Sequence, residues 1–181
     1  MSWILTHSGT RFELIMPTGA MVKPQDIAHA LAHLCRFNGH TREHYSVAQH
    51  SLLVADLVPA EHRLQALLHD ATEAYVGDMT RPLKQLMPEF QYAERRVWLA
   101  ICEAFDIEPE LHPSIHHADM LALGMERRDL MPAHPEPWEC LADLDLPAQT
   151  LTPWPAERAR MEYFNQLMTL LTTTHRLHHQ H

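Results

Sequence analysis

Apolar residues that recur every three or four positions are the feature that most restricts the fold of this chain. From Lys23 onward this spacing predicts helices over most of the sequence. Pro24 suits a first helical position, and Ser46 suits the N-cap of a second helix. Earlier in the chain, residues 3–6 and 11–15 predict one small β-hairpin, which needs helices to lie against. The expected fold class is all-α with a small N-terminal hairpin.

Helical patterns end at identifiable breakers, which divide the chain into segments. The predicted helices cover about residues 23–38, 46–59, 60–76, 89–105, 113–131 and 156–173. Residues 78–88 are expected to form a loop with one helical turn, and the proline-rich segment 132–155 should be irregular. A length of 181 residues fits a single domain, 1–181, with its core at about 20–131, followed by the proline-rich segment and the C-terminal helix 156–173.

Composition excludes several classes of protein. No stretch approaches the roughly 18 apolar residues of a membrane span, and the N-terminus lacks the pattern of a secretory signal. Cys35, Cys102 and Cys140 are widely spaced, which indicates reduced thiols and a soluble, cytoplasmic protein. A net charge of −9 argues against binding a nucleic acid polymer. It still permits one small anionic substrate in a locally basic pocket.

The strongest local signal is the adjacent pair His69–Asp70 inside an apolar helical pattern. A buried carboxylate is costly unless a cation or hydrogen bonds compensate it. Glu73 is helically spaced from both, so the three side chains are expected on one side of a helix. His50 and Asp119 lie in two other apolar segments, and two imidazoles with two carboxylates suit a divalent first-row metal. A single buried histidine is more often a hydrogen-bonded core residue, so spacing alone leaves both alternatives open.

The order His50, then His69–Asp70, then Asp119 resembles the H…HD…D signature of the HD-domain superfamily of phosphohydrolases. Two longer stretches resemble the small 5′-deoxynucleotidases and the phage-type deoxynucleoside triphosphohydrolases. These stretches are residues 36–40 with 45–51, and residues 69–73 with 77–79 and 82–84. The likeness covers about residues 3–129 and leaves the proline-rich segment and the last helix without a motif.

This resemblance implies an HD-domain helical bundle with metal-dependent phosphohydrolase activity on (deoxy)nucleoside phosphates. One divalent metal ion of the Co, Mn, Zn, Ni or Fe class would be bound. Its ligands would be His50, His69, Asp70 and Asp119. The partner would be a small-molecule nucleotide, with no nucleic acid polymer and no membrane, and relatives suggest a homo-oligomer.

The resemblance also implies roles for four further residues. Glu73 matches a position assigned to proton transfer, and Asp78 matches one that touches the deoxyribose hydroxyl or the attacking water. Arg36 and Lys84 match positions that bind phosphate; otherwise each would be a solvated surface charge.

Several alternatives stay open on the sequence. His40 and His44 either reach the pocket or cap a loop, and the loop is favoured. His116 is helically spaced from Asp119 and could serve a second metal, although one metal is expected. The histidine-rich residues 176–181 are expected to be a frayed terminus or an opportunistic metal binder, and not a functional site. An HD-type phosphodiesterase for a cyclic or modified nucleotide, or a non-catalytic nucleotide-binding module, is the alternative function. Base preference, and whether a monophosphate or a triphosphate is cleaved, are not decided.

Overall fold

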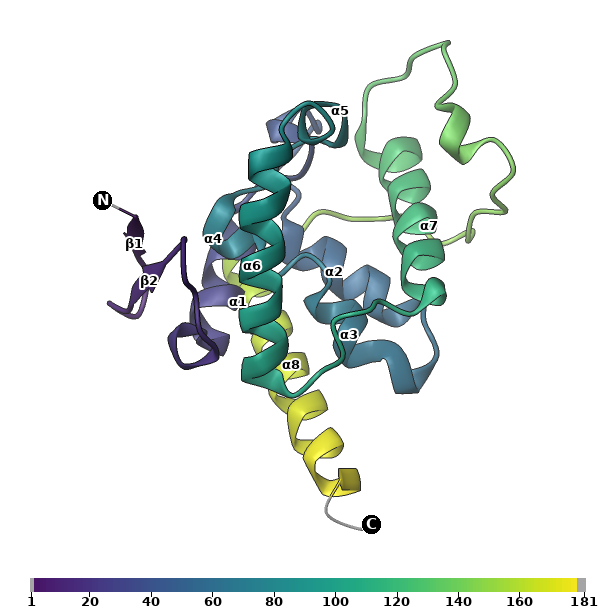
Figure 1. The fold of residues 1–181 in the computed structure, drawn as a ribbon. Helices are drawn as coiled ribbons and strands as arrows, with labels where there is room; N and C mark the ends of the chain where they lie inside the picture. Colours follow the sequence, from purple (N-terminus) through teal and green to yellow (C-terminus); the bar gives the residue numbers. More distant parts are fainter. Residues whose placement is uncertain (1, 179–181) are drawn as a thin grey trace.

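Helices make up most of the computed structural model, which describes residues 2–178 (Figure 1). One antiparallel hairpin precedes them, formed by β1 (Trp3–Leu5) and β2 (Arg11–Glu13), with Ile4 opposite Phe12. Phe12 is fully buried and stacks on the ring of Tyr75, with 3.9 Å between ring centroids. The hairpin therefore lies against the helices, and the predicted all-α class with a small N-terminal hairpin is confirmed.

Within residues 2–178, eight α-helices follow the hairpin. Their bounds are α1 (Pro24–His33), α2 (Val47–Asp56), α3 (Arg63–Leu68), α4 (Glu73–Val76), α5 (Arg81–Lys84), α6 (Pro88–Phe105), α7 (Pro113–Leu130) and α8 (Ala156–His178). Short 3-10 helices occur at Gly19–Met21, Arg36–Gly39, Ala60–His62 and Glu139–Leu141. In the view of Figure 1, α2 and α3 lie between α6 and α7, and only the C-terminal end of α8 extends beyond the other helices. Among the described residues, no helix is long and apolar enough to span a membrane.

The core forms where α8 packs against α1, α2 and α3. Its largest fully buried apolar side chains include Ile27, Leu31, Leu67, Tyr163 and Leu167. Ser46 caps α2 as predicted, because its hydroxyl accepts a hydrogen bond from the Gln49 amide at 3.1 Å. The helices predicted at 89–105 and 113–131 match α6 and α7 to within one residue. The apolar spacing therefore located most of the helices correctly.

The prediction of one continuous helix over residues 60–76 is wrong. The chain forms two short helices there, α3 and α4, separated by residues 69–72. Here backbone hydrogen bonds span three residues, as in Ala71 N to Leu68 O at 2.9 Å. Two side chains bind the carbonyls that a continuous helix would use. His69 Nδ1 donates to Ala66 O at 2.7 Å, and the Tyr163 hydroxyl donates to Leu67 O at 2.9 Å. His69 and Asp70 consequently lie in a tight turn, and not in the middle of a helix.

The first helix also ends earlier than predicted, at His33 and not near Asn38. The chain extends so that Arg36 N donates to Tyr45 O at 2.8 Å, and it then turns through Phe37 and Asn38 with positive φ of 55° and 50°. Arg36 is therefore held at the start of a tight turn, beside the segment that leads into α2.

The proline-rich segment is irregular as predicted, apart from the 3-10 turn at Glu139–Leu141. The end of the proline-rich segment is hydrogen-bonded to Gln49 of α2. Gln49 Nε2 donates to Thr152 O at 2.8 Å, and Gln49 Oε1 accepts from Trp154 N at 2.9 Å. The last helix, α8, runs to His178 and so passes the predicted end at 173. Residues 179–181 of the expected frayed terminus lie outside the described residues.

Candidate metal centre

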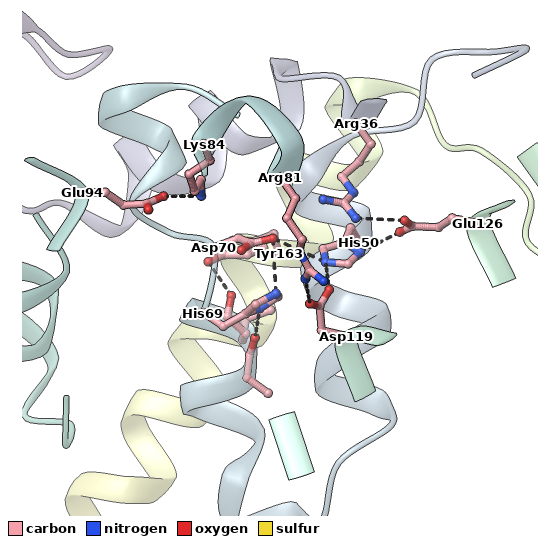
Figure 2. Close-up of polar contacts among 12 residues, drawn as sticks. Arg36, His50, His69, Asp70, Arg81, Lys84, Glu94, Asp119, Glu126 and Tyr163 are labelled. Atoms are coloured by element: carbon pink, nitrogen blue, oxygen red, sulfur yellow. Dashed lines mark hydrogen bonds and ion pairs between the residues drawn. The ribbon is translucent and has the colours of Figure 1, made fainter. Parts of the chain in front are cut away.

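Three parts of the chain bring four potential metal ligands together (Figure 2). His50 comes from α2, His69 and Asp70 from the turn between α3 and α4, and Asp119 from α7. His50 Nε2 lies 3.4 Å from Asp70 Oδ2 and 3.3 Å from Asp119 Oδ1. His69 Nε2 lies 3.2 Å from the same Asp70 oxygen. The side chains of His50, His69 and Asp119 offer ligand atoms within 4.8 Å of one another, so this group could hold one metal ion.

The free nitrogens of the two imidazoles fit a metal ion. His69 Nδ1 lies 2.7 Å from the Ala66 carbonyl, which only accepts hydrogen bonds, so Nδ1 must carry a proton. The remaining nitrogen, Nε2, then presents a lone pair toward carboxylates, which is unfavourable unless a cation or an additional proton lies between them. Nε2 of both His50 and His69 is buried without a hydrogen-bond partner. A divalent cation would satisfy both lone pairs and both carboxylates.

The two aspartates are held in the ionised form that metal ligands need. Burial alone would raise the pKa of Asp119, but the neighbouring His50 and His69 lower it to about 2. The same balance holds at Asp70, where burial is outweighed by His69 and His50 and the pKa lies well below its ordinary value. Both carboxylates are therefore negatively charged at neutral pH.

Glu126 of α7 orients His50 from the opposite side, and the sequence analysis missed it. It is fully buried, and its Oε1 accepts a hydrogen bond from His50 Nδ1 at 2.6 Å. Its Oε2 accepts from Arg36 Nη2 at 3.0 Å. Burial would raise the pKa of Glu126, but the charges of Arg36 and His50 lower it. The carboxylate thus holds the proton of His50 on Nδ1 and turns Nε2 toward Asp70 and Asp119.

The predicted catalytic residues lie in the same charged neighbourhood. Glu73 begins α4, is only 5% exposed, and its Oε2 has no hydrogen-bond partner. Burial, with the charges of Asp70 and Asp78, raises the pKa of Glu73 well above its ordinary value. Asp78 follows Gly77 and is half-buried; burial raises its pKa, and Arg36 opposes that shift. Glu73 is thus a carboxyl group that can hold a proton beside the candidate ligands.

Three basic side chains surround the cluster (Figure 2). Arg36 is 13% exposed and is bound to Glu126. Lys84 donates to Glu94 at 2.7 Å. Arg81, which the sequence analysis did not single out, lies 3.5 Å from Asp119, measured from Nη2 to Oδ2. The phosphate-binding roles of Arg36 and Lys84 stay predictions, because each already contacts a carboxylate of the protein.

Comparison with known proteins places the chain among relatives of bacterial origin. It is 37% identical over 174 residues to the uncharacterized protein YfdR of Escherichia coli (strain K12), which covers 94% of this chain and 98% of that protein. The chain belongs to the YfdR family. An uncharacterized protein of Rhodobacter capsulatus is 45% identical over 92 residues, which is 46% of this chain and 47% of that relative. No protein-family model matches the chain.

His40, His44 and His116 do not belong to the group of candidate ligands in this YfdR-family protein. His44 Nε2 lies 3.3 Å from the Ala32 carbonyl, as a loop residue would, and His40 is exposed at the end of a turn. His116 is exposed on α7. Among the residues whose side chains are described, only one group of His, Cys, Asp and Glu is close enough to hold a metal ion. The described side chains therefore favour a single ion.

Glu126→Gln is expected to weaken metal binding by about 10-fold to 100-fold, the usual effect of losing a residue that orients a ligand. The amide keeps the size of the side chain but can present an N–H to His50 Nδ1, which disturbs the orientation of the imidazole. Calorimetric titration with Mn²⁺ or Co²⁺ measures the change. Asp26→Asn is the matched control, because Asp26 is also a buried carboxylate, 2% exposed, but binds Thr6 and Ser8 in the hairpin. Equal metal affinity in both variants would show that Glu126 does not position His50.

Proposed function

We propose that this YfdR-family chain is a divalent-metal-dependent phosphohydrolase of the HD-domain type that acts on (deoxy)nucleoside phosphates. It would act as a 5′-deoxynucleotidase or as a deoxynucleoside triphosphohydrolase. The observation that carries the proposal is the convergence of two unpartnered imidazole Nε2 atoms with two ionised carboxylates. Basic side chains and a buried carboxyl group lie around this cluster, as phosphate hydrolysis would require.

The ion would be held by His50, His69, Asp70 and Asp119. When bound, it would supply Lewis-acid stabilisation of the phosphoryl group and would make water a better nucleophile. Glu126 and the Ala66 carbonyl would orient the two imidazoles, since each accepts the Nδ1 proton of one of them.

Proton transfer is assigned to Glu73. Its unpartnered Oε2 and its raised pKa suit a group that accepts a proton from water and passes it to the leaving oxygen. Asp78 would orient the nucleotide hydroxyl or the attacking water from the extended segment after Gly77. A free carboxyl group of this kind favours an enzyme over a binding module, because binding alone needs no proton transfer.

The basic residues beside the carboxylates would allow an anionic substrate to bind at this site. The ionised Asp70 and Asp119 would repel a phosphate group, so cations of the protein must offset part of this charge. Arg36 would offset this negative charge from the turn before α2, where its Nε is buried without a hydrogen-bond partner. Lys84 would do so from α5.

A phosphate-release assay on metal-loaded protein tests this proposal. The panel contains deoxynucleoside mono- and triphosphates, the matching ribonucleotides and cyclic nucleotides. Deoxynucleotides are expected to release orthophosphate or triphosphate, EDTA should abolish release, and added Mn²⁺ or Co²⁺ should restore it. The released product identifies which phosphate is cleaved. Cyclic nucleotides release no phosphate when their ring is opened, so their conversion to monophosphates is followed by chromatography. Conversion of cyclic nucleotides alone would point to a phosphodiesterase, and no hydrolysis of any nucleotide would overturn the proposal.

A further inference from the structure

Arg81 differs from the other two cations at the site in how much of its hydrogen-bonding capacity is already used. The side chain of Arg36 is 13% exposed and is paired with the fully buried Glu126 at 3.0 Å. Lys84 is 28% exposed and pairs with Glu94 at 2.7 Å. The side chain of Arg81 is 54% exposed, and among the described residues its one ion pair is the long 3.5 Å contact with Asp119. Arg81 is thus the cation with the most accessible donors.

The position of Arg81 directs these donors toward the candidate metal ligands. In Figure 2 its side chain extends from α5 toward Asp119, between Arg36 and Lys84. Nη2 faces Asp119 Oδ2, whereas the other oxygen, Oδ1, faces His50 Nε2 at 3.3 Å. Nη1 lies 3.6 Å from the sulfur of Met120, which is a weak acceptor. A guanidinium in this place can leave both contacts at small cost and bind a stronger acceptor.

The backbone that carries Arg81 is held in place. Lys84, at the other end of α5, contacts Glu94 of α6, and the Lys84 carbonyl accepts from Gln91 Nε2 at 2.7 Å. These two hydrogen bonds connect α5 to α6. Arg81 therefore combines a fixed attachment with a half-exposed side chain, which suits a residue that must reach an incoming ligand.

We propose that Arg81 binds the phosphate group of the substrate, by a two-pronged contact between its guanidinium and two phosphate oxygens. This inference rests on the proposed function, because it takes the substrate to be a phosphate ester bound at the His50–Asp119 cluster. The planar guanidinium matches phosphate oxygens, and Arg81 has more accessible donors than Arg36, whose Nη2 is paired with Glu126. Bound phosphate would then replace Asp119 and Met120 as the partner of Arg81.

Arg81→Ala, Arg81→Lys and the control Arg95→Ala test this assignment. Arg95 of α6 is matched to Arg81, since it is half-exposed and also makes one 3.5 Å ion pair, with Glu110. Loss of a charged hydrogen-bonding group is expected to weaken binding by about 10-fold to 100-fold. We expect Arg81→Ala to raise KM for nucleotide by this factor and to weaken inorganic phosphate binding, measured by calorimetry on metal-loaded protein. Arg81→Lys should recover part of the loss, and Arg95→Ala should resemble the wild type.

Metal content separates a phosphate-binding role from a structural one. Arg81→Ala should keep the metal, because the change removes a competing cation from Asp119. Loss of metal in this variant would overturn the inference, as would an unchanged KM together with unchanged phosphate affinity. A wild type that binds phosphate through Arg81 but hydrolyses no nucleotide would contradict the proposed function and leave the phosphate contact standing. A wild type that hydrolyses nucleotide with no effect of Arg81→Ala would contradict the inference alone.

Discussion

Asp70→Ala is expected to remove bound metal and nucleotide hydrolysis together. Asp70 Oδ2 lies 3.2 Å from His69 Nε2 and 3.4 Å from His50 Nε2, so it is the oxygen that lies near both imidazoles. A metal ion contributes several kcal/mol to stabilising a phosphoryl transition state, which corresponds to a rate loss of about 10³-fold or more. Elemental analysis of protein reconstituted with Mn²⁺, together with kcat on the best substrate of the panel, measures both effects.

Two further variants make the Asp70 result specific. Asp70→Asn keeps the shape of the side chain but removes its charge, so it should also lose the metal. Asp129→Ala is the control, because Asp129 lies near the end of α7, its side chain is 8% exposed, and its carboxylate binds Arg128 and the Leu151 amide outside the cluster. Full metal content in Asp70→Ala would mean that His50, His69 and Asp119 suffice as ligands, and Asp70 would leave the assigned set.

Local pattern was enough to predict most of the secondary structure. The apolar spacing located α2, α6 and α7, and the hydroxyl of Ser46 marked the start of α2, because both signals are confined to neighbouring residues. The break at residues 69–72 was missed for the opposite reason. It depends on the Tyr163 hydroxyl, which binds Leu67 O from 96 residues away along the chain. A helical pattern cannot distinguish a continuous helix from two short helices joined by a tight turn.

At the candidate site, too, the features that depend on neighbouring residues were predicted and those that depend on distant contacts were missed. The resemblance assigned His50, His69, Asp70 and Asp119 as ligands, and the structure brings these side chains together. Glu126 was missed, although it follows Asp119 by seven residues and so lies on the same helix face. Its significance comes from contacts with Arg36 and His50, which are 90 and 76 residues away in sequence. Such pairings become visible only when the helices are placed beside one another.

Glu73→Gln is expected to keep the metal and to bind nucleotide, while kcat falls by roughly 10²-fold to 10⁴-fold, the usual contribution of general acid–base catalysis. Glu73 lies beside the cluster, and its Oε2 has no hydrogen-bond partner, so replacing the carboxyl group breaks no hydrogen bond of that oxygen. The amide preserves the volume of the buried side chain but cannot transfer the proton. Metal content, nucleotide affinity and kcat would be measured on one preparation.

Glu73→Ala separates proton transfer from packing, because it removes both the carboxyl group and its buried volume. A similar fall in kcat for both variants, with equal thermal stability of Glu73→Gln and the wild type, would assign the loss to the missing carboxyl group. Metal loss in Glu73→Gln would instead make Glu73 a ligand and change the assigned set. If kcat barely changed in either variant, another group would move the proton. His44 is a poor replacement, since its Nε2 faces the Ala32 carbonyl at 3.3 Å. Asp78, whose pKa is raised by burial and by the charge of Asp70, would then be the residue to substitute next.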